Sequence, residues 1–199
     1  MRAELEAAHL AREAGLPACR RTIRSCGLAI RAIHRGETER AAELTAEAGT
    51  ALREAQAALA PHPSVAFAGF LHDAEKEYAE ARLTAALVAR APLEGHDAIG
   101  VQPAAWLNGL AEAASELRRH LLDRLRAGSL DDAEHLLASM DDVYELLVTI
   151  DFPDAITGGL RRTTDALRAV LERTRSDLTL TLVQARLQRA LEGGTSGLS

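Results

Sequence analysis

Apolar residues recur every three or four positions along most of the chain, and no long segment alternates with a period of two. A spacing of three or four residues places the apolar side chains on one face of an α-helix, so the pattern predicts helices and no strand. Prolines, glycines and short polar runs interrupt the pattern and mark the expected helix ends. The expected helices span about residues 3–14, 18–35, 38–60, 65–90, 104–126, 130–150 and 160–191.

Three interruptions of the apolar pattern predict where helices end and where a loop lies. Gly15-Leu16-Pro17 and Pro61-His62-Pro63 are expected to end helices, because proline lacks a backbone N–H and clashes with the preceding turn. Residues 91–103 hold two prolines and two glycines and predict a loop. We therefore predict an all-α, single-domain helical bundle of six to seven helices over residues 1–192, followed by a flexible tail at 193–199.

The composition indicates how the core is built and which partners and compartment are expected. Hydrophobic residues make up 47% of the chain but aromatic residues only 3%, so alanine, leucine and valine must build the core. The formal net charge of -6 counts against a nucleic-acid binder unless basic residues are concentrated locally. Cys19 and Cys26 lie in one expected helix, about 10 Å apart along its axis, too far apart for a disulfide. We expect a cytoplasmic protein, because Glu4 and Glu6 precede any apolar run and no run is long enough to span a membrane.

Two pairs of glutamates are the strongest candidates for chemistry. Glu77 and Glu80 are three residues apart, and Glu112 and Glu116 are four apart, so each pair shares a helix face. If the two helices pack side by side, four carboxylates converge, and such oxygen-rich sites select Mg²⁺ or Mn²⁺. A bound ion of this kind polarises a phosphoryl oxygen and activates water. The alternative is that these glutamates are ordinary solvated faces of alanine-rich helices.

Arginines form two concentrations along the chain. Between Arg12 and Arg35 six arginines stand against one acidic residue, Glu13. A second cluster, from Arg118 to Arg126, follows directly after Glu116. Arginine contacts phosphate through two parallel hydrogen bonds, although the same residues could form salt bridges between helices or subunits. The predicted nucleic-acid-binding residues are Arg20, Arg21, Arg24, Arg31, His34, Arg35, Arg118 and Arg119.

Four segments in the same order resemble the translin/Trax family. Residues 77–81 (EYAEA) resemble the family's Glu-Tyr-Val-Glu-Ala stretch, and residues 109–119 resemble its Gly-(Leu/Val)-x-Asp-Leu-x-Gly-Glu-Leu-x-Arg segment. Residues 20–35 are similar to its opening helix, and residues 160–168 to the start of its last helix. The resemblance covers most of the chain, and the ordered combination of segments carries it.

The resemblance implies a translin-like all-α domain that assembles into a closed homo-oligomer enclosing RNA. Family assemblies commonly have eight subunits, and the sequence does not fix whether this chain forms an octamer, a hexamer or another number. Trax subunits cut RNA with Mg²⁺ or Mn²⁺, held by two glutamates on one helix and an aspartate and a glutamate on another. Matched onto this chain, these residues are Glu77, Glu80, Glu112 and Glu116. Glu112 departs from the family's aspartate by one extra methylene group.

The resemblance therefore implies a metal-dependent endoribonuclease that acts on single-stranded RNA and also binds single-stranded DNA. Two alternatives stay open. The chain could be an inactive oligomer that binds single-stranded nucleic acid, as translin subunits mainly do. It could also be a helical-bundle metal or structural protein unrelated to nucleic acid. The single Glu-x-x-His, at Glu6 and His9, argues against a di-iron bundle, which needs two.

Overall fold

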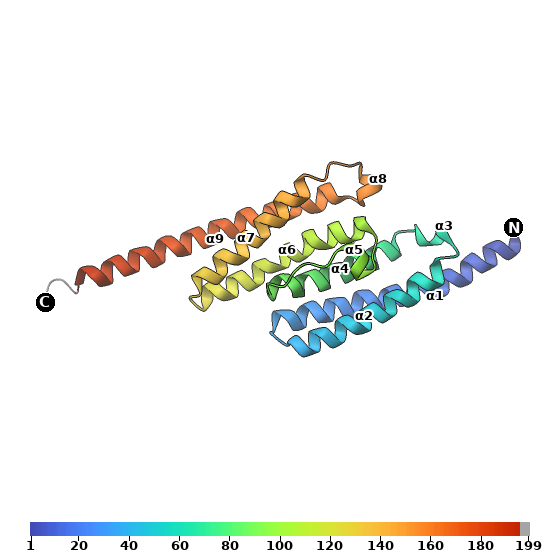
Figure 1. The fold of residues 1–199 in the computed structure, drawn as a ribbon, viewed down its shortest axis with the longest axis horizontal. Coiled ribbons are helices and arrows are strands. Elements are labelled where there is room, and N and C mark those ends of the chain that lie inside the picture. The colour runs from blue at the N-terminus through green and yellow to red at the C-terminus, as the bar shows by residue number, and fades with distance from the viewer. Residues whose placement is uncertain (196–199) are drawn as a thin grey trace.

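The computed structural model describes residues 1–195, and in that part of the chain all regular structure is helical. The described residues form six long helices and three single-turn helices, whose arrangement is drawn in Figure 1. The long helices are α1 (Arg2–His34), α2 (Thr38–Leu59), α4 (Phe70–Val88), α6 (Pro103–Arg126), α7 (Leu130–Val148) and α9 (Leu160–Thr195), and the short ones are α3 (Pro63–Ala66), α5 (His96–Ile99) and α8 (Asp154–Thr157). The prediction of an all-α fold with six to seven main helices is confirmed.

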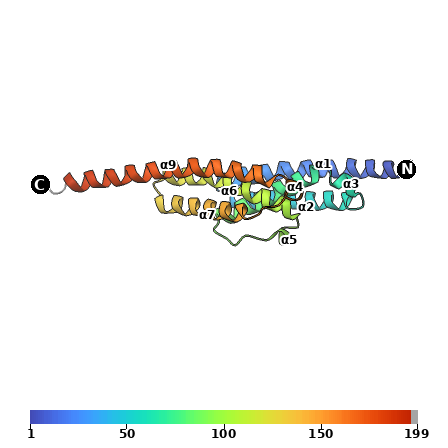
Figure 2. The same cartoon turned by 90° about the horizontal axis from the view of Figure 1, so that it is seen from above.

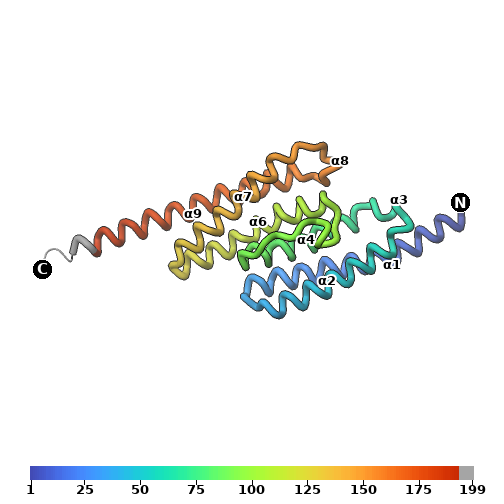
Figure 3. The backbone as a smooth tube through the Cα atoms, viewed as in Figure 1, coloured from blue at the N-terminus to red at the C-terminus, as the bar shows by residue number. Residues whose placement is uncertain are grey.

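The helices pack in a continuous series across the molecule. The hairpin of α1 and α2 contacts α4, which packs against α6, and α7 and α9 cover the other side of α6 (Figures 1 and 3). The segment between α4 and α6, which contains α5, returns the chain so that these two helices run in the same direction. This parallel pairing determines which side chains of α4 and α6 meet at their interface.

The core lies along α6 and is built from leucine and alanine. Leu110, Leu117 and Leu121 have no exposed surface, and each contributes about 1.5–3 kcal/mol through burial. Alanines such as Ala79 and Ala113 are equally buried and let neighbouring helices approach closely. Both cysteines are buried free thiols, as their spacing predicted.

The predicted break at Gly15-Leu16-Pro17 is wrong, because α1 continues through Pro17 as one helix of 33 residues. Proline at this place removes one hydrogen bond within the helix and costs about 3 kcal/mol in an isolated helix. The packing of α1 along α2 holds the segment helical nevertheless. A Cβ on Gly15 would lie 2.7 Å from Leu59 Cγ, so Gly15 lets that leucine pack directly on the α1 backbone.

Other helix ends follow the prolines and glycines more closely. Helix α2 ends at Leu59, before Pro61, and α6 begins at Pro103, where proline suits the first helical turn. The predicted loop at 91–103 contains one short helical turn, α5. Helix α9 extends to Thr195, and the rest of the predicted tail, residues 196–199, lies outside the described residues.

The distal half of α9 projects beyond the body of the bundle (Figures 1 and 2). Leu180, Val183 and Leu187 on this projecting segment are 56–60% exposed. Exposed apolar residues at helical spacing are typical of interaction surfaces. None of the helices in the described part of the chain is long and apolar enough to cross a membrane.

Candidate metal centre and nucleic-acid surface

A close approach of two parallel helices forms the base of the site. The backbone of α6 at Gly109 lies directly against α4: a Cβ at this position would be 2.8 Å from the Lys76 carbonyl oxygen and 2.9 Å from the Glu80 nitrogen. Real side chains do not tolerate such distances, so only glycine permits this contact. The contact brings the glutamates of both helices to one side of the interface.

Three of the four predicted carboxylates meet at this interface. Glu77 and Glu80 from α4 and Glu112 from α6 offer carboxylate oxygens that lie within 4.8 Å of one another. Glu80 is the deepest of them, with only 8% of its surface exposed, and it makes no hydrogen bond or ion pair among residues 1–195. We call Glu77, Glu80 and Glu112 the carboxylate cluster.

Burial and mutual repulsion raise the pKa values of carboxyl groups in the cluster. Burial raises the pKa of Glu80 to about 8, and the neighbouring charges of Glu112, Glu77 and Glu116 act in the same direction. Burial also raises the pKa of Glu77, with Lys76 opposing the rise and Glu112 adding to it. Like charges held this close in a partly buried site destabilise one another unless a cation lies between them.

Lys76 supplies part of that positive charge. Its Nζ donates a 2.8 Å hydrogen bond to Glu112 Oε1 and lies 3.7 Å from Glu77 Oε1. Burial acts to lower the pKa of Lys76, but the contact with Glu112 and the other nearby carboxylates raise it overall. The chain's only lysine therefore stays charged beside the carboxylate cluster.

The fourth predicted carboxylate, Glu116, stands at the edge of the cluster and is hydrogen-bonded to His34, which in turn contacts His120. Its Oε2 lies 2.6 Å from His34 Nε2, and His34 Nδ1 lies 3.1 Å from His120 Nε2. The sequence predicts that His34 binds nucleic acid; in the structure its side chain is only 5% exposed. The structure thus places His34 with the carboxylates, at the point where α1 ends against α6.

The predicted nucleic-acid-binding arginines divide into free and paired groups. Those without an ion pair or side-chain hydrogen bond among residues 1–195 are exposed: Arg20, Arg24 and Arg31 on α1 and Arg119 on α6. Those already paired are Arg21 with Glu54, Arg35 with Glu37 and Arg118 with Asp177. Only the first group is available to contact phosphate without breaking an existing ion pair.

The free arginines of α1 share one exposed face of the helix. Arg20, Arg24 and Arg31 are separated by four and seven residues, which places them on one face of the helix. Arg31 precedes His34 by one turn. A groove of about 450 Å³ on α6 is lined by both Glu116 and Arg119.

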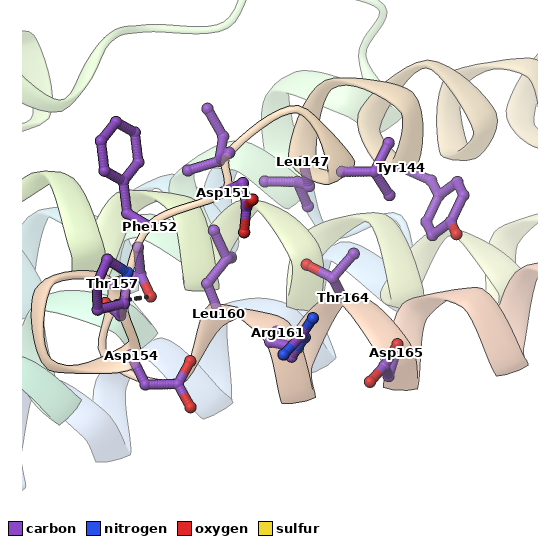
Figure 4. Close-up of a pocket in the computed structure, with 13 residues that line it drawn as sticks. Tyr144, Leu147, Asp151, Phe152, Asp154, Thr157, Leu160, Arg161, Thr164 and Asp165 are labelled. Atoms are coloured by element: carbon purple, nitrogen blue, oxygen red, sulfur yellow. Dashed lines mark hydrogen bonds between the residues drawn. The ribbon is translucent and has the colours of Figure 1, made fainter.

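A further pocket lies away from these residues. This cavity of about 760 Å³ lies where the end of α7, α8 and the start of α9 meet, and Figure 4 shows the residues that line it. Asp151, Asp154 and Asp165 contribute acidic groups, and Arg161 a basic one. None of the predicted site residues lines it, so the candidate chemistry stays at the α4–α6 interface.

Several residues of the site could not be singled out from the sequence. Lys76 belongs to no recognisable motif, and Gly109 gives no sign in the sequence of the helix contact that it permits. His120 follows Glu116 by four residues, so helical spacing could have placed both on one face. No sequence pattern links His34 to Glu116, because they are 82 residues apart and meet only through the packing of α1.

Comparison with known proteins identifies similar chains. AfC3PO, whose crystal structure has been determined alone and as a complex with duplex RNA, superposes with a TM-score of 0.84. It shares 34% sequence identity over 94% of this chain and 96% of its own. Apo-NeC3PO superposes with a TM-score of 0.81 at 16% identity, covering 90% of this chain and 94% of that chain, and supports the fold alone.

An uncharacterized protein of Methanocaldococcus jannaschii is 26% identical over 190 residues, which are 94% of this chain and 84% of that protein. No family model matches the chain.

Proposed function

Because the chain belongs to the translin/Trax-like C3PO family, we propose that it is a metal-dependent endoribonuclease that binds and cuts single-stranded RNA. The observation that carries the proposal is the carboxylate cluster at the α4–α6 interface. Its donor set contains only oxygen, which favours Mg²⁺ or Mn²⁺ over zinc or copper.

The residues present fit a divalent cation. Glu80 is buried without a hydrogen-bond partner among residues 1–195, and its raised pKa reflects burial and repulsion from the other carboxylates. Lys76 Nζ lies within 4 Å of both Glu77 and Glu112 and brings one positive charge to the cluster. A divalent ion would supply more of the same charge and satisfy the Glu80 carboxylate.

The proposed roles follow from the positions of the side chains. Glu77, Glu80, Glu112 and Glu116 would hold Mg²⁺ or Mn²⁺, which supplies Lewis acidity and an activated water when bound. Arg119 shares a groove with Glu116 and would bind the scissile phosphate. The α1 row of Arg20, Arg24 and Arg31 would hold the flanking backbone, so binding would depend on salt and little on sequence.

RNA is favoured as the substrate by the relative AfC3PO, which has been seen with duplex RNA. We propose single-stranded RNA as the cleaved form, with single-stranded DNA as a second ligand. We also propose a homo-oligomer, because the projecting half of α9 exposes apolar side chains that a second copy would cover.

One observation favours the inactive alternative, a protein that binds nucleic acid without cutting it. Lys76 already forms ion pairs with Glu112 and Glu77, so the cluster also fits a structural ion-pair network between α4 and α6. In that case the acidic residues would stabilise the helix interface, and only the arginines would act on RNA.

A cleavage assay separates the two. Labelled single-stranded and duplex RNA would be incubated with the protein in Mg²⁺, in Mn²⁺ and in a chelator, beside Glu116→Gln. The matched control is Glu145→Gln, on the exposed face of α7, where the glutamate has no ion pair within the described residues. Metal-dependent cutting by the control and not by Glu116→Gln supports the nuclease. Tight binding with no cutting in any metal would leave the nucleic-acid-binding protein.

A further inference from the structure

A chain of two histidines joins α1 to the carboxylate at the edge of the site. His34 is the last residue of α1, and its buried ring lies between Glu116 and His120 of α6. The two imidazole rings are tilted by 33° with centroids 4.9 Å apart. His34 is thus bound on both of its ring nitrogens, one to a carboxylate and the other to a second histidine.

The donor and acceptor roles in this chain can be assigned. A carboxylate only accepts, so the 2.6 Å contact requires His34 Nε2–H to donate to ionised Glu116. A neutral His34 then has a bare Nδ1, which accepts from His120 Nε2–H. If His34 is instead protonated, Nε2–H still donates to Glu116, and His120 Nε2 becomes the acceptor. The hydrogen bond to Glu116 is therefore the same in both protonation states.

This hydrogen bond restricts a side chain that would otherwise move. The Glu116 side chain is 35% exposed and borders the open groove on α6, where its carboxylate makes no other hydrogen bond to residues 1–195. His34 occupies Oε2, which leaves Oε1 without a hydrogen bond to residues 1–195, and the charge of Glu116 acts on Glu80 of the carboxylate cluster. Carboxylates that bind metals are commonly fixed in this way, by a hydrogen bond from a neighbouring group to one oxygen.

We infer that His34 is a positioning residue for Glu116: it orients the Glu116 carboxylate toward the carboxylate cluster, and His120 holds the His34 ring in place. The inference rests on the proposed function, because it assigns His34 a task only if Glu116 contributes to a metal centre. It differs from the sequence prediction, in which His34 contacts nucleic acid.

The test uses two amides that imitate different ring nitrogens. His34→Gln places an N–H donor near the position of Nε2, and His34→Asn reaches only to the position of Nδ1. Mn²⁺ affinity of the full chain would be measured by electron paramagnetic resonance of the free ion, without RNA. The control is His135→Asn, an exposed histidine on α7.

We expect His34→Asn to weaken Mn²⁺ binding by about 10–100-fold and His34→Gln to restore most of it. In a Glu116→Gln background, His34→Asn should have no further effect, because the two residues act through one contact. Circular dichroism would verify that each variant folds. If His34→Asn does not fold, His34→Leu replaces it, since leucine keeps the apolar volume and favours a helix.

Equal Mn²⁺ affinity of wild type and of the folded His34→Asn or His34→Leu variant would overturn the inference and leave the proposed nuclease intact. Failure of His34→Gln to restore affinity would overturn it as well, since the role assigned to His34 is donation from Nε2. Wild-type protein that neither binds Mn²⁺ nor cuts RNA would remove the proposed function, and this inference with it.

Discussion

Replacing Glu80 by glutamine tests whether the carboxylate cluster lowers the free energy of unfolding of the metal-free protein. Glu80 is buried beside three other acidic side chains, and its pKa is raised from 4.5 to about 8, first by burial and then by those charges. Glutamine keeps the shape of the side chain but never carries a charge. Glu80→Gln should therefore stabilise the metal-free protein wherever Glu80 would be ionised after unfolding.

The size of the effect follows from the pKa of the two states. Below about pH 4.5 Glu80 is protonated in both the folded and the unfolded chain, so it adds no pH dependence. As the pH rises from 4.5 to 8, the unfolded chain releases this proton while the folded chain retains it, and the free energy of unfolding falls. The loss is about 3 kcal/mol at pH 7 and approaches roughly 5 kcal/mol above pH 8.

Urea denaturation in a chelator, followed by circular dichroism between pH 5 and 9 at fixed protein concentration, measures this difference. The stability of Glu80→Gln relative to wild type should increase steadily with pH and level off above pH 8. Glu145→Gln, on an exposed face, should follow the wild type throughout. A constant difference between Glu80→Gln and wild type across this range, or a less stable variant at pH 8, would refute the electrostatic reasoning.

Three further results are expected. Mn²⁺ at about 100 times its dissociation constant should raise the unfolding free energy of wild type by about 2.7 kcal/mol, seen as a higher Tm, and should leave Glu80→Gln unchanged. Gly109→Ala should lower the free energy of unfolding by about 1–3 kcal/mol in urea denaturation and weaken Mn²⁺ binding, because the added Cβ forces α6 away from α4. The control Gly27→Ala should not destabilise the protein, because a Cβ there would meet only one atom, at 3.8 Å. Arg24→Ala should reduce the slope of log affinity for single-stranded RNA against log salt by about 0.7. Arg21→Ala should reduce this slope by less, because Arg21 already pairs with Glu54.

Most helix positions could be predicted from the sequence because their ends are local. Pro61 and Pro103 act on the backbone beside them, whatever the rest of the chain does. The prediction failed at Pro17 for the opposite reason. The long contact of α1 with α2, in which Gly15 packs on Leu59, outweighs the local penalty, and a tertiary contact of this kind has no local pattern.

The candidate site divides in the same way. The spacing of Glu77 and Glu80, and of Glu112 and Glu116, is enough to place each pair on one helix face, because helical periodicity is a local property. Which helices then meet depends on the close approach at Gly109 and on the parallel return of the chain through α5. The contact of His34 with Glu116 depends on where α1 ends in space, so spacing along the sequence could not reveal it.

The energetics of the site also bear on the choice between a nuclease and a structural ion-pair network. A network selected for stability would pair each buried carboxyl group, because a carboxyl group whose pKa is raised in the folded state lowers the free energy of unfolding at neutral pH. Lys76 pairs Glu112 and Glu77, but Glu80 lies deeper and has no partner among residues 1–195. A glutamine would occupy that position without the charge and at lower cost. Natural proteins accept such costs mainly where function requires them, so the unpaired Glu80, more than the number of acidic residues, supports a cation-binding site.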